Sequence, residues 1–214
     1  MKQYFIDNNS QKLIVFFAGW GCDENQFANL KDNNFNILIF FDYQDLNFNF
    51  DFSAYKDVYV VAYSAGGMIS CVLEDKIPNI RKRVAVNSNP FLFDEKLGVP
   101  ADVLKVFQSI TMENYMEFRR QYMVFDEAEF ELYNKYGSKR SLESCEGEYL
   151  SLLKIYNEYK NIIKPNFDKA IFADNDAIFN LSAQKEFFKD KIKIIPSSKH
   201  HLFFRFNSFE DMLM

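Results

Sequence analysis

Ser64 stands where a predicted strand meets a predicted helix. The β-branched and aromatic run 58–62 stops at this serine, and apolar residues at helical spacing follow immediately. Ala62 and Gly66 flank it in the pattern Ala-x-Ser-x-Gly, one methyl group away from the Gly-x-Ser-x-Gly of a nucleophile elbow. Because such a turn pushes the serine hydroxyl outward, Ser64 is the candidate nucleophile. The alternative is a serine that only caps a helix.

A nucleophilic serine needs a base, and histidine suits this role because its pKa lies near neutrality. The chain has two histidines, His200 and His201, which follow a predicted strand at 191–195. Adjacent residues of an extended loop cannot both point into one site, so we expect one histidine to be the base and the other to be structural. The sequence leaves the choice open, and we take His200 as the candidate base. Two surface histidines are the alternative.

A carboxylate that orients the histidine is expected after the preceding strand, at 170–173. Asp174 and Asp176 both stand there. Asp176 is favoured because the acid usually lies a few residues beyond the strand, and the order serine, acid, histidine is that of α/β-hydrolases. The two aspartates could instead bind a metal, but no third cluster of ligands accompanies them, so we predict no metal site.

The loop Ala18-Gly19-Trp20-Gly21-Cys22 leaves a predicted strand at 13–17. Its glycines could simply allow a tight connection to a helix. Together with Ser64, however, a loop with free backbone N–H groups favours half of an oxyanion hole. Cys22 is a weaker nucleophile candidate because no elbow presents it. Asp23 is the expected N-cap of a helix at 24–32.

The elements that must position these residues form a mainly parallel sheet. Strands that alternate with helices predict this arrangement. An N-terminal hairpin is expected to begin the sheet, and the alternating residues 46–52 resemble a further, exposed strand. The other strands are expected at 37–41, 58–62, 83–87, 170–173 and 191–195.

From about Val99 to Lys164 the apolar residues keep helical spacing without a convincing strand, and Pro165 ends this region. We therefore predict an α/β-hydrolase core at 1–96 and 165–214 with an inserted helical lid at 97–164. Ordinary covering helices are the alternative to a lid.

Composition narrows the functional class. A net charge of −5 and a pI of about 5.2 leave no basic footprint for nucleic acid. No apolar run approaches the ~18 residues of a membrane span, and the N-terminus lacks a signal-peptide pattern, so a cytoplasmic protein is expected. Three scattered cysteines suit neither a disulfide framework nor a zinc site, so reduced thiols are expected.

Several segments together resemble the pimeloyl-acyl-carrier-protein (ACP) methyl ester esterases of biotin synthesis, in size the small BioG type. The Gly-Trp-Gly loop joined to the Ala-x-Ser-x-Gly elbow is the most specific part, and the resemblance covers nearly the whole chain. The segments that carry it are 17–21, 62–67, 87–91, 174–176 and 200–203.

The resemblance implies an esterase that removes the methyl group of pimeloyl-ACP methyl ester without a metal or organic cofactor. Ser64 would attack the ester carbonyl, His200 would move the proton and Asp176 would orient the imidazole. The backbone N–H groups of Trp20 and Ala65 would hold the oxyanion. A serine carboxylesterase or thioesterase for another acyl group is the alternative, and a non-catalytic binding protein is a more distant one.

The resemblance also implies a basic surface that docks the acidic carrier protein. A solvated helix face explains the same charges nearly as well. Aromatic and methionine residues of the insertion, with Phe203 and Phe204, are expected to enclose the pimeloyl chain. The candidate docking residues are Arg119, Arg120, Lys135, Lys139 and Arg140.

Overall fold

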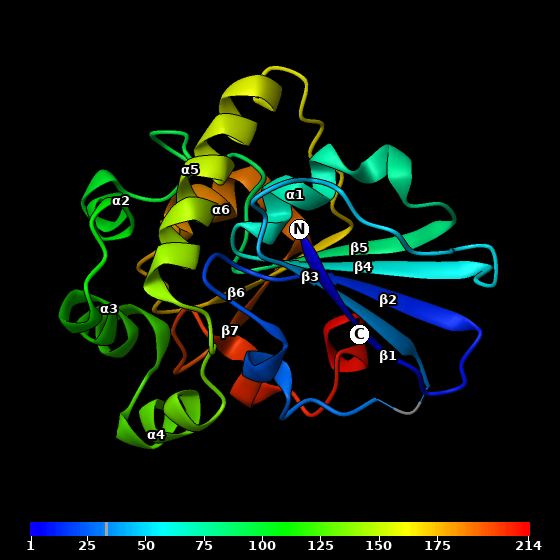
Figure 1. The fold of residues 1–214 in the computed structure, drawn as a ribbon, viewed down its shortest axis with the longest axis horizontal. Coiled ribbons are helices and arrows are strands. Elements are labelled where there is room, and N and C mark those ends of the chain that lie inside the picture. Colours follow the sequence, from blue (N-terminus) through cyan, green and yellow to red (C-terminus); the bar gives the residue numbers. More distant parts are fainter. Residues whose placement is uncertain (33) are drawn as a thin grey trace.

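The computed structural model describes residues 1–32 and 34–214 as a seven-stranded sheet with helices around it (Figure 1). The strands lie in the order β1-β3-β2-β4-β5-β6-β7. Every neighbouring pair is parallel except β1 and β3. The strands are β1 (Lys2–Ile6), β2 (Lys12–Phe17), β3 (Asn36–Phe41), β4 (Asp57–Tyr63), β5 (Ile80–Val86), β6 (Lys169–Ala173) and β7 (Ile192–Ile195). The predicted mainly parallel sheet is therefore confirmed.

The expected N-terminal hairpin is wrong. β1 pairs antiparallel with β3, whereas β2 lies on the other side of β3 and pairs parallel with both β3 and β4. Burial explains the difference. β2 is buried from Leu13 to Phe17 and needs neighbours on both sides, whereas β1 is mostly exposed and occupies the edge.

Two further segments differ from expectation. Residues 46–52 form no strand, because their phenylalanines pack onto the sheet instead: Phe48 contacts Phe40, and Phe50 contacts Phe5. Residues 24–32 hold only one 3-10 turn (Glu24–Phe27) rather than a helix. Asp23 caps that turn as predicted, and its carboxylate accepts the Asn25 N–H.

Four helices occupy the predicted insertion between β5 and β6. In Figure 1 they lie together on one side of the sheet, in green to yellow. No helix within the described residues is long and apolar enough to cross a membrane. The helices of the structure are α1 (Gly66–Val72), α2 (Ala101–Gln108), α3 (Met112–Phe118), α4 (Glu127–Lys135), α5 (Leu142–Tyr159) and α6 (Leu181–Phe188), with a π-helical turn, η3 (Arg119–Met123), between α3 and α4.

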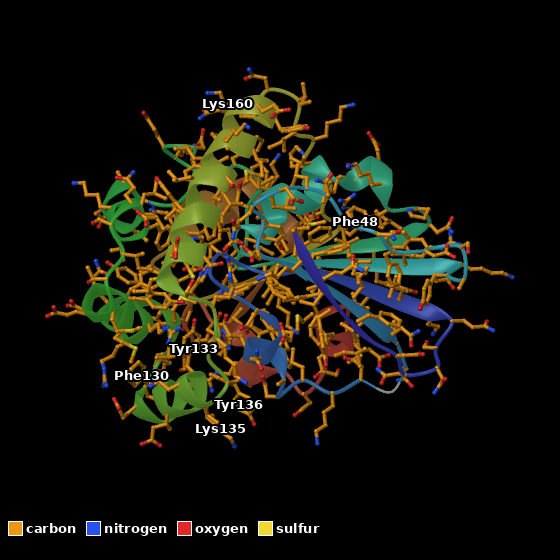
Figure 2. All side chains as sticks on the ribbon, viewed as in Figure 1. Phe48, Phe130, Tyr133, Lys135, Tyr136 and Lys160 are labelled. Atoms are coloured by element: carbon orange, nitrogen blue, oxygen red, sulfur yellow. The ribbon has the colours of Figure 1, made fainter. Side chains whose placement is uncertain are left out.

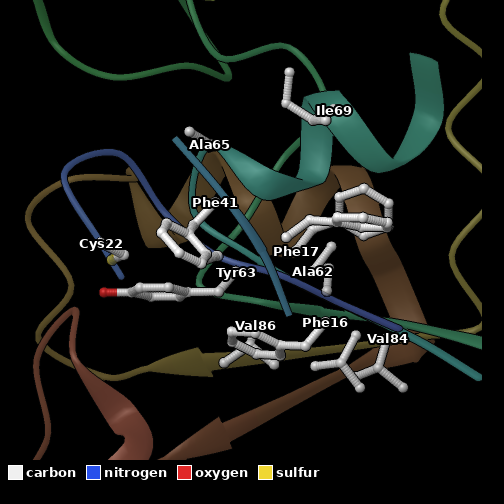
Figure 3. Close-up of a cluster of buried hydrophobic side chains, with 14 of the residues drawn as sticks. Phe16, Phe17, Cys22, Phe41, Ala62, Tyr63, Ala65, Ile69, Val84 and Val86 are labelled. Carbon is white, nitrogen blue, oxygen red and sulfur yellow. The ribbon is translucent and has the colours of Figure 1, made fainter. Parts of the chain in front are cut away.

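The aromatic core packs directly beneath Ser64. Tyr63, the residue before it, is buried, and Figure 3 shows its ring next to the Cys22 side chain. The Tyr63 ring contacts Phe203 edge to face with centroids 4.8 Å apart, and it also contacts the imidazole of His200. The end of β4 is thus held rigidly by the same rings that support the histidine loop.

We predict that Gly66→Ala destabilises the protein by ~2 kcal/mol or more, because overpacking against backbone cannot be relieved by a rotamer change. A Cβ at Gly66 would lie 2.2 Å from the Phe17 carbonyl oxygen. Gly147→Ala is the matched control, because a Cβ at that helical position has only the Gln44 side chain near it, at 3.7 Å. Urea unfolding should show Gly147→Ala to be neutral or slightly stabilising. Equal effects of the two substitutions would contradict the close approach of α1 to β2.

Candidate active site

Ser64 lies in a strained turn between β4 and α1. Its φ of +53° is in the left-handed region, which costs a non-glycine residue on the order of 1–3 kcal/mol. Neighbouring groups hold it there: Ser64 N–H donates to the Val86 carbonyl at 3.3 Å, and the Ser88 hydroxyl donates to the Ser64 carbonyl at 2.6 Å. This is the geometry that a nucleophile elbow requires.

The structure brings Ser64, His200 and Asp176 together from three separate loops. The Oγ of Ser64 lies 2.9 Å from Nε2 of His200, and Nδ1 of His200 lies 3.0 Å from Oδ2 of Asp176. With Nδ1–H donating to the carboxylate, Nε2 is free to accept the serine proton. The Asp176 carboxylate is itself fixed by the N–H groups of Ile178 and Phe179, at 2.8 and 3.3 Å.

The backbone of the loop that carries His200 is held by hydrogen bonds that could not be predicted from the sequence. Asn87, at the end of β5, is fully buried and donates from its amide nitrogen to the His200 carbonyl at 2.8 Å, while its amide oxygen accepts the Ala173 N–H at 2.8 Å. From the insertion, η3 accepts the His200 and His201 N–H groups through the carbonyls of Tyr122 and Met123. Asn87 belonged to a segment of the resemblance, but its role appears only in the fold.

His201 and Asp174 lie apart from this array. The His201 imidazole is buried among Tyr63, Tyr133, Phe203 and Phe204, and its ring nitrogens have no hydrogen-bond partner in the described part of the chain. The carboxylate of Asp174 instead accepts the backbone N–H groups of residues 197 and 198. Both residues thus support the loop rather than touch Ser64.

The burial of His201 predicts a pH dependence of stability. Desolvation lowers the pKa of His201 to about 3, below its usual value of 6.5. The unfolded chain therefore binds the proton first, so stability is complete above pH 6.5 and falls as the pH falls toward 3. From pH 7.5 to pH 5 the wild type should lose ~2 kcal/mol more than His201→Phe in urea unfolding. Parallel losses in the two proteins would contradict a neutral, buried His201.

The glycine-framed loop passes beside Ser64. A Cβ at Gly19 would lie 3.1 Å from the Cβ of Ser64, so the two backbones approach closely. The backbone N–H groups of Trp20 and Ala65 have no protein acceptor within residues 1–32 and 34–214. Two free N–H donors beside a serine hydroxyl suit the oxygen of a tetrahedral intermediate.

An uncharged pocket opens beside Ser64 and His200. Helices α2, α3 and α5 contribute apolar walls, including Phe107, Phe118 and Leu152. None of the described residues that line it is an aspartate, glutamate, lysine or arginine. The pocket therefore suits a neutral, mainly aliphatic group next to the serine.

The two phenylalanines expected along the acyl chain lie elsewhere. Phe203 is fully buried in the aromatic core with Phe16 and Phe27. Phe204 borders a separate surface groove with Leu132. That expectation is therefore wrong for these two residues, because their side chains pack in the core and at the groove and do not line the pocket beside Ser64.

The five basic candidates do not form one surface. Arg120, Lys135 and Lys139 are exposed, and Arg119 is half-buried over the ring of Tyr115. Figure 2 shows Lys135 at the outer end of α4. The Arg140 side chain is only 4% exposed and pairs with Asp42 and Glu148. Arg140 is therefore wrong as a docking residue, because its charge is already neutralised inside the protein.

The remaining chemical alternatives find little support in the geometry. Burial raises the pKa of the Cys22 thiol far above its ordinary value, which keeps it protonated and weakly nucleophilic. Within the described residues, no three histidine, cysteine, aspartate or glutamate side chains gather as metal ligands. The array at Ser64 is thus the best-formed reactive arrangement in the part of the chain that the structure describes.

A family model of the pimeloyl-ACP methyl esterase BioG matches residues 1–212. The chain belongs to this family. The crystal structure of BioG from Haemophilus influenzae is similar over 99% of both chains, with 28% sequence identity and a TM-score of 0.88. The fold is that of the α/β-hydrolases, and an esterase from Exiguobacterium antarcticum shares it with a TM-score of 0.64 at 12% identity over 95% of this chain and 89% of that one.

A second relative is a longer protein. A malonyl-[acyl-carrier protein] O-methyltransferase of Bacteroides fragilis is 29% identical over 182 residues. These cover 82% of this chain but 36% of that relative. The chain thus spans about a third of the methyltransferase polypeptide.

Proposed function

We propose that this protein hydrolyses the methyl ester of pimeloyl-ACP to free pimeloyl-ACP and methanol, using Ser64, His200 and Asp176 as a catalytic triad. The observation that carries the proposal is the hydrogen-bonded chain from Ser64 through His200 to Asp176, placed at an uncharged apolar pocket. Membership of the BioG family supplies the substrate class.

The proposed reaction begins with attack of Ser64 Oγ on the ester carbonyl while His200 Nε2 takes its proton. The N–H groups of Trp20 and Ala65 hold the developing oxyanion, a contact worth ~3 kcal/mol per donor in comparable sites. His200 then returns the proton to the departing methoxide, and methanol leaves. Water, activated by the same histidine, attacks the acyl-enzyme and releases the carboxylate and Ser64.

The uncharged pocket also favours release of the product. A neutral methyl ester is weakly hydrated, so it can pack against apolar walls at little desolvation cost. The carboxylate product pays a large desolvation cost in the same pocket, because no described lining residue neutralises its charge. The product is therefore expected to leave readily. The apolar walls thus favour the neutral ester over its acid.

A carrier-bound substrate is supported by the Bacteroides relative. Its name describes a methyl transfer to malonyl-ACP, and a segment similar to this chain is part of the same polypeptide. A reaction that forms a methyl ester on an ACP-bound acyl group is complementary to one that removes it. We therefore propose the acyl carrier protein as the partner and the cytoplasm as the location.

For docking, we propose the exposed positive charges of Arg120, Lys135 and Lys139, together with the half-buried Arg119. Lys135→Glu should raise KM for methyl pimeloyl-ACP about fivefold at low salt, because rim charges mainly steer the encounter. Lys160→Glu, at the far end of α5 in Figure 2, is the matched control. KM for a small p-nitrophenyl ester should not change in either variant. Equal effects of the two reversals on the ACP substrate would remove Lys135 from the docking surface.

The direct test uses purified protein and methyl pimeloyl-ACP, with the carrier followed by intact mass. The proposal expects loss of one methylene's mass while the acyl chain stays on the carrier. Release of the acyl chain would instead indicate a thioesterase. Hydrolysis of simple esters without action on the ACP substrate would leave a carboxylesterase for another acyl group.

A further inference from the structure

Glu148 of α5 is a carboxylate with no exposed surface, outside the proposed triad. Its Oε2 accepts the Gly21 N–H at 2.8 Å, and its Oε1 accepts the Tyr43 N–H at 2.9 Å. Gly21 directly follows Trp20, the proposed oxyanion donor. One helix of the insertion thus reaches the loop that passes beside Ser64.

Arg140 balances the charge of Glu148. Its Nη1 lies 2.5 Å from Glu148 Oε2, and its Nη2 lies 2.6 Å from Asp42 Oδ1. Burial raises the pKa of Glu148, and the Arg140 charge and the two N–H donors oppose that rise. Because donors face both carboxylate oxygens, a proton on either oxygen would displace one of these bonds.

Two further hydrogen bonds hold the same loop, one through the Trp20 side chain and one through the Ala18 backbone. The Trp20 indole N–H donates to the Cys145 carbonyl at 2.7 Å, one turn before Glu148 on α5. The Tyr43 hydroxyl donates to the Ala18 carbonyl at 2.9 Å. Gly21 itself has φ +71°, a conformation open to glycine. These contacts leave the backbone N–H of Trp20 as a donor without a protein acceptor among the described residues.

We infer that Glu148 is a positioning residue for the oxyanion hole: by binding the Gly21 N–H it fixes the Trp20–Gly21 peptide, and through the Cα of Trp20 it keeps the preceding peptide, which carries the Trp20 backbone N–H, directed at the reacting carbonyl. This inference rests on the proposed esterase function. It assigns α5 a second role besides lining the pocket. Since 1 Å of misplacement can cost ~10²-fold in rate, a loss of Glu148 should appear mainly in kcat.

The test is Glu148→Gln, measured with methyl pimeloyl-ACP and with p-nitrophenyl butyrate. The amide can accept only one of the two N–H donors and leaves Arg140 without this carboxylate. We expect kcat to fall about 10–100-fold on both substrates with KM nearly unchanged, as for loss or displacement of a transition-state donor.

Glu74→Gln is the matched control, because it also removes the carboxylate partner of a buried arginine, Arg83, but touches neither Gly21 nor Trp20. It should lose stability and keep its kcat. Similar kcat in the two variants at equal folded fraction would overturn the inference, because Glu148 would then act only on stability.

Two outcomes separate the inference from the proposed function. If the wild type hydrolyses p-nitrophenyl butyrate but not methyl pimeloyl-ACP, the substrate proposal fails while the kcat comparison still decides the role of Glu148. If Glu148→Gln does not fold, Glu148→Asp keeps the charge beside Arg140 but shortens the reach to Gly21, and the same fall in kcat is expected. Failure of both variants to fold would make Glu148 a core residue and reject the positioning role.

Discussion

Ser64→Ala should lower kcat for methyl pimeloyl-ACP by ~10⁵-fold or more, because removal of the nucleophile also makes His200 and Asp176 ineffective. The substitution removes one hydroxyl from a turn that is held by backbone contacts at both sides. We therefore expect the variant to fold and to bind the substrate with little change in affinity. Steady-state kinetics and a binding titration with methyl pimeloyl-ACP measure the two quantities.

Ser70→Ala is the control for this prediction. Ser70 lies on α1 one and a half turns after the elbow, and its buried hydroxyl donates to the Gly67 carbonyl at 3.0 Å. Its loss should cost ~1 kcal/mol of stability and leave kcat within a few-fold of wild type. Substantial turnover by Ser64→Ala would exclude Ser64 as the nucleophile.

Asp176→Asn should lower kcat by ~10⁴-fold with little effect on folding, because an amide in this position favours the wrong imidazole tautomer. Both Asp176 oxygens lie within 3.1 Å of His200 Nδ1. An asparagine can still accept the N–H groups of Ile178 and Phe179 through its oxygen, but its nitrogen then faces the ring.

Asp174→Asn makes the same chemical change two residues earlier. Since Asp174 binds only the backbone of the following loop and Asn175, its substitution should alter kcat less than about threefold. If Asp174→Asn were the inactive variant and Asp176→Asn the active one, the assignment of the acid would be reversed.

Local sequence signals were sufficient to predict most strands and to select the candidate residues that the fold brings together. The elbow, the glycine-framed loop and the Asp-x-Asp segment each depend on small or polar residues at the end of a strand, and parallel strands bring such ends to one edge of a sheet. The geometry of neighbouring residues in a loop indicated that one of His200 and His201 is the base, but it did not say which. In the structure only His200 reaches Ser64.

Non-local contacts could not be predicted in the same way. The order β1-β3-β2 depends on which strand must be covered by neighbours on both sides. The sequence instead predicts a hairpin, because the first two strands are separated by a short polar turn. Arg140 was predicted to be a surface charge because its two partners could not be recognised in the sequence. Asp42 is far from Arg140 along the chain, and Glu148 is one of several glutamates in the same helical region. Glu148 did carry a signal, because it stands on the buried face of α5 with Cys145, Leu152 and Ile155.

The most direct test is hydrolysis of methyl pimeloyl-ACP in ¹⁸O-labelled water. The proposed mechanism cleaves the bond between the acyl carbon and the methoxy oxygen, so one ¹⁸O should appear in the new carboxylate of carrier-bound pimelate and none in the methanol. The Ser64→Ala variant should produce neither product. Label in the methanol would contradict attack at the ester carbonyl, and label in a methyl pimelate released from the carrier would show that the thioester is the bond this protein hydrolyses.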